Sequence, residues 1–411
     1  MEQPLKSVDD HLADVLSVVS PLAPLELQLL DAHGCVLAED VTTPVPLPPF
    51  DNSAMDGYAV RSADLRDANP LTLVTLPVVG DVAAGSVSAA SIRPGMCMRI
   101  MTGALLPVGS DAVVPVEWTD GGLASVTVTR APAVGAHLRR AGEEVAAGDT
   151  VLAAGTPIGA AQLGLLASVG RDRVRVRPRP RVVVISTGSE LAEVGTPLSE
   201  AQIFDSNSYA LTAAAREAGA IPYRVGIVPD DPRLLLNILE DQLIRADVVV
   251  TSGGVSVGAY DVVKEVLARI GTVSFDRVAM QPGMPQGFGT LGPDSVPIFG
   301  LPGNPVSAFV SFEVFVRPAL RRMLGAEPIN RPQVSATLAA PLRAPAGKRA
   351  YARARLSMRD GARVVTPVGG AGSHLVVGLA AANALVVVPE EVTEVAAGET
   401  VRVMVLERRQ R

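Results

Sequence analysis

The middle of the chain alternates between short apolar runs and longer amphipathic segments. The apolar runs are rich in β-branched residues, which is typical of strands buried on both faces of a parallel sheet. They cover residues 181–186, 223–228, 248–250 and 296–299. The segments 206–219 and 232–244 between them have the spacing of helices with one apolar face. This order predicts a doubly wound α/β domain, in which the loops after the strands meet at one edge of the sheet.

The strand at 248–250 runs directly into a glycine-rich turn. Residues 247–264 read DVVVTSGGVSVGAYDVVK, and their glycines would let the backbone approach a ligand with its N–H groups pointing at an anion. Residues 262–270 have helical spacing, so a helix N-terminus would add partial positive charge at the same place. Such turns are also common as tight connections without a ligand. Repetition of the layout along the sheet favours an anion site.

A second glycine-rich loop follows the strand at 296–299. Residues 300–305 read GLPGNP and lead into a long apolar helix that we expect to continue to about Leu324. Asn304 is predicted to be the N-cap of this helix and Pro305 its first residue, since these residue types favour those positions.

Three acidic residues follow the predicted strands and should meet at the edge of the sheet. Glu190 follows the first strand, Asp230 the second, and Asp261 lies at the start of the helix at 262–270. Helix capping or solvation is the simpler explanation for any one of them. Three carboxylates would repel an anion, whereas Mg²⁺ is held by one or two carboxylates together with ligand oxygens. The set therefore favours a Mg²⁺ site.

The regions on either side of the α/β pattern are richer in strands. Ser7 and Asp10 resemble a capping box that opens an amphipathic helix, whose apolar face we expect to be buried in the first domain or in a dimer interface. Residues 72–140 contain short strands separated by glycine and proline, as in a small inserted β domain. After residue 328 the strand pattern returns and predicts a small β-barrel.

Composition and charge narrow the class of protein. The chain has 411 residues and a formal net charge of −6, enough length for several domains. Its basic residues form no dominant block, so we expect no nucleic-acid partner. The N-terminus has no signal-peptide pattern and no apolar run reaches the roughly 20 residues of a membrane span, so we expect a cytoplasmic protein with no membrane segment. Cys35 and Cys97 are expected to be core residues in a reducing compartment.

Several motifs resemble those of one family. TSGGVSVG at 251–258, followed by Asp261 and Lys264, is similar to the molybdopterin-binding signature of molybdenum cofactor assembly proteins. Four further motifs resemble hallmarks of the molybdopterin molybdotransferase branch, known as MoeA and as the E domain of gephyrin. They are PPFDNSAMDGYAVR at 48–61, RIMTGALLPVGSDAVVPVE at 99–117, GLPGNPVSA at 300–308 and GSH at 372–374. The resemblance covers essentially the whole chain.

The resemblance implies an elongated homodimer whose subunits have four domains. Domain I would be discontinuous, with residues 1–54 and 143–178, and a β-rich domain II would be inserted at 55–142. The molybdopterin-binding α/β domain III would span 179–327, and a C-terminal β-barrel-like domain IV would span 328–411.

The resemblance also implies a reaction. Molybdate would be inserted into the dithiolene of adenylylated molybdopterin with the help of Mg²⁺, the adenylate would be hydrolysed, and AMP and molybdenum cofactor would be released. The motifs do not distinguish molybdate from the nearly isosteric tungstate. Further partners would be the molybdopterin adenylyltransferase and the apoenzymes that receive the cofactor. An alternative is a non-catalytic paralogue that acts as a molybdopterin carrier or scaffold.

The motifs and the resemblance together predict the site residues. Asp56, Thr102, Glu190, Asp230 and Asp261 are the expected catalytic residues, and the last three are also the expected Mg²⁺ ligands. In a homodimer, Asp56 and Thr102 would come from the neighbouring subunit. The residues expected to bind the pterin substrate are Gly253, Gly254, Ser256, Gly258, Lys264, Pro302, Gly303, Asn304, Pro305, Ser373, Arg139 and Arg277. His374 would contact the ligand or bond to the loop backbone.

The chain departs from the family pattern at several positions. Gln281 and Met284 stand where the family usually has the lysines of KPGKP, and Ser189 replaces the aspartate of TGDE. A missing lysine would weaken the binding of a nearby phosphate by about 1 to 4 kcal/mol. The possible substitutes are Arg277, Arg139, Arg140 and Lys264, and a guanidinium holds phosphate at least as well as an ammonium.

Overall fold

The β-branched runs in the middle of the chain form one six-stranded sheet in the order β16-β13-β17-β21-β20-β18. A computed structural model describes residues 4–86, 91–254 and 262–406 of the protein. The strands are β13 (Arg181–Thr187), β16 (Ile221–Val228), β17 (Val248–Ser252), β18 (Gly271–Arg277), β20 (Pro285–Leu291) and β21 (Val296–Leu301). The predicted strands β13, β16, β17 and β21 are confirmed and run parallel.

Two antiparallel strands at one edge of this sheet lie outside the prediction. β18 pairs with β20, and β20 pairs with β21. β18 alternates apolar and polar residues, and β20 contains Gly287 and Gly289, so neither has the continuous apolar run of a buried strand. A side chain at Gly289 would place its Cβ 1.9 Å from Thr272 O, which explains why glycine occupies this position.

Helices cover both faces of the sheet. α3 (Asn207–Glu217), α6 (Pro305–Ser311) and α7 (Arg317–Leu324) share one core, and α4 (Pro232–Leu243) and α5 (Val262–Ile270) share the other. Val182 and Val184 belong to the first core and Val183 to the second, because successive strand residues face opposite sides. The doubly wound α/β fold is therefore confirmed. A π-helical turn, Phe312–Val316, joins α6 to α7 within the predicted long helix.

The N-terminal helix α1 (Val8–Val18) begins as predicted but packs elsewhere. Ser7 Oγ accepts a hydrogen bond from Asp10 N at 3.0 Å, which confirms the helix start. Val8 and Val15 are buried in the same core as α3 and α7. The expectation that this face is buried in the first domain is wrong, because the apolar surface that covers it is on the α/β unit.

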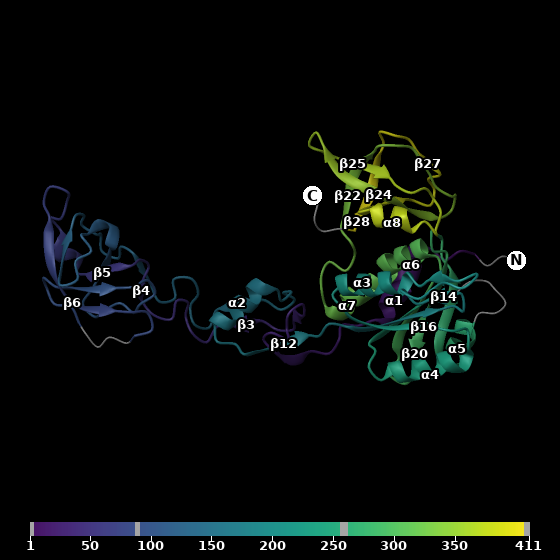
Figure 1. Ribbon diagram of the computed structural model, residues 1–411, viewed down its shortest axis with the longest axis horizontal. Coiled ribbons are helices and arrows are strands. Elements are labelled where there is room, and N and C mark those ends of the chain that lie inside the picture. Colours follow the sequence, from purple (N-terminus) through teal and green to yellow (C-terminus); the bar gives the residue numbers. More distant parts are fainter. Residues whose placement is uncertain (1–3, 87–90, 255–261, 407–411) are drawn as a thin grey trace.

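The N-terminal half extends away from the α/β unit and contains two larger sheets (Figure 1). Two short strand pairs lie beside them, β3 (Val41–Thr42) with β11 (Thr150–Leu152) and β4 (Asn52–Ser53) with β10 (Leu138–Arg139). The sheet nearer that unit contains β1 (Leu25–Gln28), β12 (Arg173–Arg177) and β2 (Val36–Leu37), with α2 (Ala160–Ser168) beside it. The far sheet contains β5 (Gly57–Val60), β6 (Val74–Val82), β7 (Cys97–Ile100), β8 (Ala112–Pro115) and β9 (Ser125–Val128). The predicted β-rich insertion is present, and the molecule is elongated.

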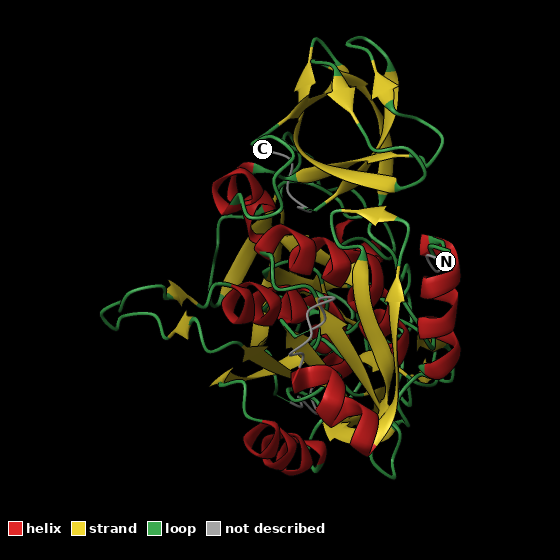
Figure 2. Cartoon of the chain, turned by 90° about the vertical axis from the view of Figure 1, so that its right-hand side faces the viewer, coloured by secondary structure: helices red, strands yellow, loops and turns green. Residues whose placement is uncertain are grey.

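The C-terminal strands close into a barrel, as predicted. It contains β22 (Gln333–Leu338), β24 (Arg349–Arg359), β25 (Ala362–Pro367), β26 (Ala384–Val388) and β28 (Thr400–Val405). Each strand pairs with two others of this set, which closes the ring. Figure 2 shows the barrel above the α/β unit, and β19 (Met280–Gln281) links the two by pairing with β24.

Two features of the described residues agree with the composition. Cys35 and Cys97 are buried and free, so both are core residues as expected. Among residues 4–86, 91–254 and 262–406, no helix has the length and apolarity to cross a membrane.

Candidate active-site cleft

The loops after the parallel strands surround a cleft of about 730 Å³. It lies at the carboxyl edge of the sheet, where ligands bind in open α/β folds. Many of the predicted site residues meet there. Those that line the cleft are Glu190, Asp230, Gly253, Gly254, Pro302, Gly303, Asn304 and Pro305. Ser256, Gly258 and Asp261 lie outside the described residues, and only the backbone of Lys264 is described, within α5.

The glycines after β17 are required by the backbone. Gly253 and Gly254 have φ of +98° and +67°, values that favour glycine. A Cβ at Gly253 would also lie 2.5 Å from Thr187 O. The N–H of Gly253 donates to Leu301 O at 3.1 Å, so this group ties two loops together and is not directed at a ligand. The prediction that N–H groups of this turn point at an anion therefore does not apply to Gly253.

Two carboxylates line the cleft from neighbouring loops. Asp230 Oδ2 accepts hydrogen bonds from Ser189 N at 3.1 Å and Ser189 Oγ at 3.2 Å, so the serine that replaces the family's aspartate orients Asp230. Glu190 lies beside the glycine turn, where a Cβ at Gly188 would come 2.6 Å from Glu190 Oε2. Both groups offer the hard oxygens that Mg²⁺ prefers.

The described part of the chain holds no cluster of three or more His, Cys, Asp or Glu side chains that would bind a metal by themselves. Mg²⁺ needs only one or two protein carboxylates when ligand oxygens and water complete its shell. Glu190 and Asp230 therefore fit this ion, and the third predicted ligand, Asp261, lies outside the described residues.

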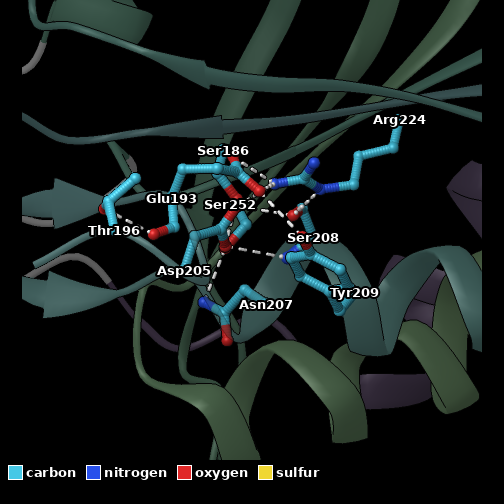
Figure 3. Close-up of polar contacts among 9 residues, drawn as sticks. All are labelled: Ser186, Glu193, Thr196, Asp205, Asn207, Ser208, Tyr209, Arg224 and Ser252. Carbon is cyan, nitrogen blue, oxygen red and sulfur yellow. Dashed lines mark hydrogen bonds and ion pairs between the residues drawn. The ribbon is translucent and has the colours of Figure 1, made fainter.

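Asp205 anchors one wall of the cleft and was not predicted from the sequence. Its side chain is buried and accepts hydrogen bonds from Ser186 Oγ at 2.9 Å and from Ser208 N at 3.0 Å (Figure 3). Arg224 Nη2 lies 3.6 Å from Asp205 Oδ2 and also binds Glu193. This network fixes the chain where it enters α3.

Asn207, the first residue of α3, joins two of the loops around the cleft. Its Nδ2 donates to Ser252 Oγ and to Gly303 O, both at 2.7 Å. It thereby fixes the turn after β17 against the loop after β21. The sequence signal for this role is Asp205-Ser206-Asn207 at a helix start beside the sheet edge, a pattern that also suits ordinary helix capping.

The loop that carries Ser373 is attached to both the barrel and α6. Ser373 O accepts a hydrogen bond from Val306 N at 3.0 Å, in the first turn of α6. The buried Arg353 donates to Leu375 O at 2.8 Å and to Gly372 O at 3.0 Å, and burial lowers the pKa of Arg353. These contacts hold the loop that carries His374, and His374 lines the cleft.

Arg277, at the end of β18, lies beside one of the positions where a family lysine is missing. Its Nη2 lies 3.9 Å from Met284 Sδ, and the next residue, Pro285, lines the cleft. Gln281, the second departure, pairs with Ala350 of the barrel. A guanidinium is therefore present next to position 284, as expected for a substitute.

Asp56, Thr102 and Arg139 lie far from the cleft of the same chain. Asp56 directly precedes β5 in the far sheet, which Figure 1 shows at the opposite end from β14 (Leu191–Ala192). Asp56 Oδ1 accepts from Thr102 N at 2.6 Å and from Thr102 Oγ1 at 2.8 Å, and these bonds hold the pKa of Asp56 below 3.8. Arg139 lies in β10 (Leu138–Arg139), also in the N-terminal half.

Comparisons with known proteins cover nearly the whole chain. Residues 6–170 match the MoeA N-terminal region (domain I and II), residues 183–322 the probable molybdopterin binding domain, and residues 335–406 the MoeA C-terminal region (domain IV). Molybdopterin molybdenumtransferase 2 of Mycobacterium tuberculosis is 48% identical over 97% of this chain and 99% of its own length. Molybdopterin molybdenumtransferase of Nostoc sp. is 36% identical over 98% and 94%.

Solved structures agree with these matches. The crystal structure of a molybdopterin biosynthesis MoeA protein from Pyrococcus horikoshii superposes with a TM-score of 0.79 and 31% identity, over 98% of this chain and all of its own. The described fold, the cleft and the sequence relatives lead to the same family. The chain belongs to the MoeA family of molybdopterin molybdenumtransferases.

Proposed function

We propose that the protein inserts molybdenum from molybdate into adenylylated molybdopterin and releases AMP and molybdenum cofactor. The observation that carries this proposal is the cleft at the carboxyl edge of the sheet, which places Glu190 and Asp230 beside glycine-rich turns. Relatives that match nearly the full chain at 36 to 48% identity are named as molybdopterin molybdenumtransferases, which supports the same activity.

In this proposal Glu190 and Asp230 hold Mg²⁺, with Asp261 as a further ligand. The ion supplies charge neutralisation for a phosphoanhydride under hydrolysis. Ser189 contributes by fixing one carboxylate oxygen of Asp230. Asn207 holds the two glycine-rich loops in place through its hydrogen bonds to Ser252 and Gly303. Arg277 provides positive charge beside position 284. Hydrolysis of this kind depends on positioning and electrostatics more than on a covalent nucleophile.

We propose further that the active protein is a homodimer in which Asp56, Thr102 and Arg139 of one subunit complete the cleft of the other. The support is the separation of these residues from the cleft within one chain (Figure 1). An isologous dimer of an elongated subunit brings the far end of each chain to its partner and produces two equivalent sites.

The remaining expectations belong to the same proposal. The four-domain division at residues 1–54 with 143–178, 55–142, 179–327 and 328–411 would place the cleft in domain III, with a loop of domain IV beside it. The adenylyltransferase that supplies the substrate and the apoenzymes that receive the cofactor would be its protein partners in the cytoplasm.

The test is AMP release from adenylylated molybdopterin by the purified protein with Mg²⁺, measured with and without molybdate. Molybdate-dependent release that Glu190→Ala abolishes would support the transferase and the metal role together. The comparisons give no support to a non-catalytic carrier, because the near full-length relatives are named as transferases. Tight substrate binding without release in the unmodified protein would nevertheless contradict the transferase and favour the carrier.

A further inference from the structure

Two exposed apolar side chains line the cleft, and the proposed chemistry gives them no role. Ile203 and Phe204 retain 57% and 44% of their surface exposed and both border the cleft. They form strand β15 (Ile203–Phe204), which pairs in parallel with β14. Leaving an aromatic ring and a neighbouring aliphatic side chain in water forgoes burial that would stabilise the fold. An exposed apolar surface inside a cleft is typical of a ligand-binding wall.

The backbone beneath these side chains is firmly held. Ile203 N donates to Glu190 O at 2.9 Å, and Asp205 N donates to Ala192 O at 3.0 Å. Directly after Phe204, the buried Asp205 carboxylate is fixed by Ser186, Ser208 and Arg224 (Figure 3). The backbone of Ile203 and Phe204 is therefore held in place where it borders the cleft. Successive strand residues face opposite sides, so the two side chains do not form one flat surface, and the aromatic ring of Phe204 is the group suited to a planar ligand.

The sheet topology places this surface where mononucleotides bind in similar folds. The order β16-β13-β17-β21 reverses its direction between β13 and β17, which is the switch point at which doubly wound sheets bind nucleotides. The turns at Gly188 and at Gly253 follow these two strands, and both line the cleft together with Phe204. A nucleotide with its phosphate at the turns would have its base within the same cleft as Phe204.

We propose that the aromatic ring of Phe204 stacks on the adenine ring of the adenylylated substrate and of the AMP product, with Ile203 beside it in the lining of the cleft. This inference rests on the proposed function and adds the part of the site that recognises the base. A flat heteroaromatic ring stacks on an aromatic side chain, and the phosphates remain at the glycine turns. Phosphate contacts are the same for every nucleotide, so any part of the binding that depends on the base has to come from this wall of the cleft.

Phe204→Ala tests this role in the full-length protein. AMP binding, measured by calorimetry in the presence of Mg²⁺, should weaken about 5- to 100-fold, the range for loss of one base–aromatic stack. Binding of inorganic pyrophosphate, which has no base, should not change, and Phe204→Trp should retain AMP binding. Leu198→Ala is the matched control, because Leu198 is 46% exposed in the same segment between β14 and β15 but does not line the cleft.

The outcomes separate this inference from the proposed function. Unchanged AMP binding by Phe204→Ala, equal weakening of AMP and pyrophosphate, or an unmodified protein that binds no AMP would each overturn the adenine surface. Molybdate-dependent AMP release in the unmodified protein is a separate measurement. Its absence, alongside AMP binding that depends on Phe204, would contradict the transferase and leave the base-binding surface standing.

Discussion

The cleft of the α/β unit and the Asp56–Thr102 end of the far sheet hold the two halves of the predicted catalytic set, and they differ in construction. In the cleft, loops from several strands converge, and Asp230 and Asn207 are fixed by contacts between loops. Asp56 is an exposed carboxylate. Among the described side chains, Thr102 is the one that donates a hydrogen bond to it. The electrostatic interactions of an exposed carboxylate are weak in water. Those of Asp56 would become stronger if another surface covered this end of the far sheet.

The surroundings of Asp56 are suited to such a covering surface. Met55, Met101 and Val116 are 37%, 41% and 41% exposed. Val116 N donates to Asp56 O at 3.1 Å, so Val116 lies against the Asp56 backbone, while Met55 and Met101 directly precede Asp56 and Thr102. Apolar side chains around a polar pair are typical of an interface. These exposed apolar side chains are what the proposed homodimer would require around Asp56 and Thr102.

The largest expected change in activity comes from one variant in the cleft and one at the Asp56–Thr102 end, tested singly and as a mixture. Glu190→Ala and Asp56→Ala should each reduce molybdate-dependent AMP release by at least about 100-fold, the upper range for loss of a group that supports a metal site. If each site uses both subunits, a hybrid dimer of the two variants contains one intact site. A mixture of the two chains should then regain about a quarter of the unmodified activity, since half of the dimers are hybrids and half of their sites are intact.

A mixture of Glu190→Ala with Asp230→Ala is the control for this complementation. Both changes lie in the same cleft, so no hybrid of these chains contains an intact site and no activity should return. Recovery in the control, or no recovery with Asp56→Ala, would contradict the sharing of sites between subunits.

The next effect concerns how the cleft is held together. Asn207→Ala removes the hydrogen bonds to Ser252 and Gly303. Displacement of the two loops by about 1 Å should lower kcat on the order of 10- to 100-fold. The cost in unfolding free energy should be small, about 1 to 3 kcal/mol for two hydrogen bonds. The measurements are steady-state kinetics and thermal unfolding.

Ser206→Ala is the control for Asn207→Ala, because Ser206 is an exposed neighbour in the same cleft and, among the described residues, makes no hydrogen bond to Ser252 or Gly303. Equal kinetic losses in both variants would show that Asn207 has no special positioning role.

A smaller effect is expected where the chain departs from the family pattern. Met284→Lys restores the usual residue but places an ammonium near Arg277, whose Nη2 lies 3.9 Å from Met284 Sδ. Repulsion between like charges at this distance amounts to about 1 to 4 kcal/mol. We therefore expect a raised KM and no gain in activity, with partial recovery in the double variant Arg277→Gln, Met284→Lys. A gain from Met284→Lys alone would show that Arg277 does not replace the lysine.

The sequence predicted those parts of the fold that follow from local patterns. β17 is buried on both faces, and the apolar run at residues 248–250 within it is the pattern that predicted the strand. The helix starts at Ser7 and Asn304 follow from residue type. β20 escaped prediction because its glycines leave room for the neighbouring strand. The placement of α1 against the α/β unit was not predicted either. An amphipathic pattern indicates that one face of a helix is buried, but not which surface covers that face.

The sequence predicted which loops form the site, but not the hydrogen bonds that hold these loops together. Parallel strands place Glu190 and Asp230 at one edge, so their meeting follows from topology. The hydrogen bonds of Asn207 and the use of the Gly253 N–H by Leu301 depend on the packing of residues distant in sequence. The distance between Asp56 and the cleft depends on how the N-terminal half extends, which no local pattern encodes (Figure 1).

The smallest effect is at the far end, where Thr102 donates twice to Asp56. The backbone N–H contributes most to the lowered pKa of Asp56 and the hydroxyl next, so Thr102→Val should raise this pKa but leave it below the ordinary value of an aspartate. Ionised Asp56 is favoured in the folded state above its ordinary pKa, and that contribution disappears as the pH falls through the folded value. Carboxyl-carbon NMR titration measures the change, with Asp120, whose pKa is lowered by Thr127 and Gly122, as an internal control. An unchanged Asp56 pKa in Thr102→Val would mean that the hydroxyl does not hold the carboxylate, and the far end would then depend on the Thr102 backbone alone.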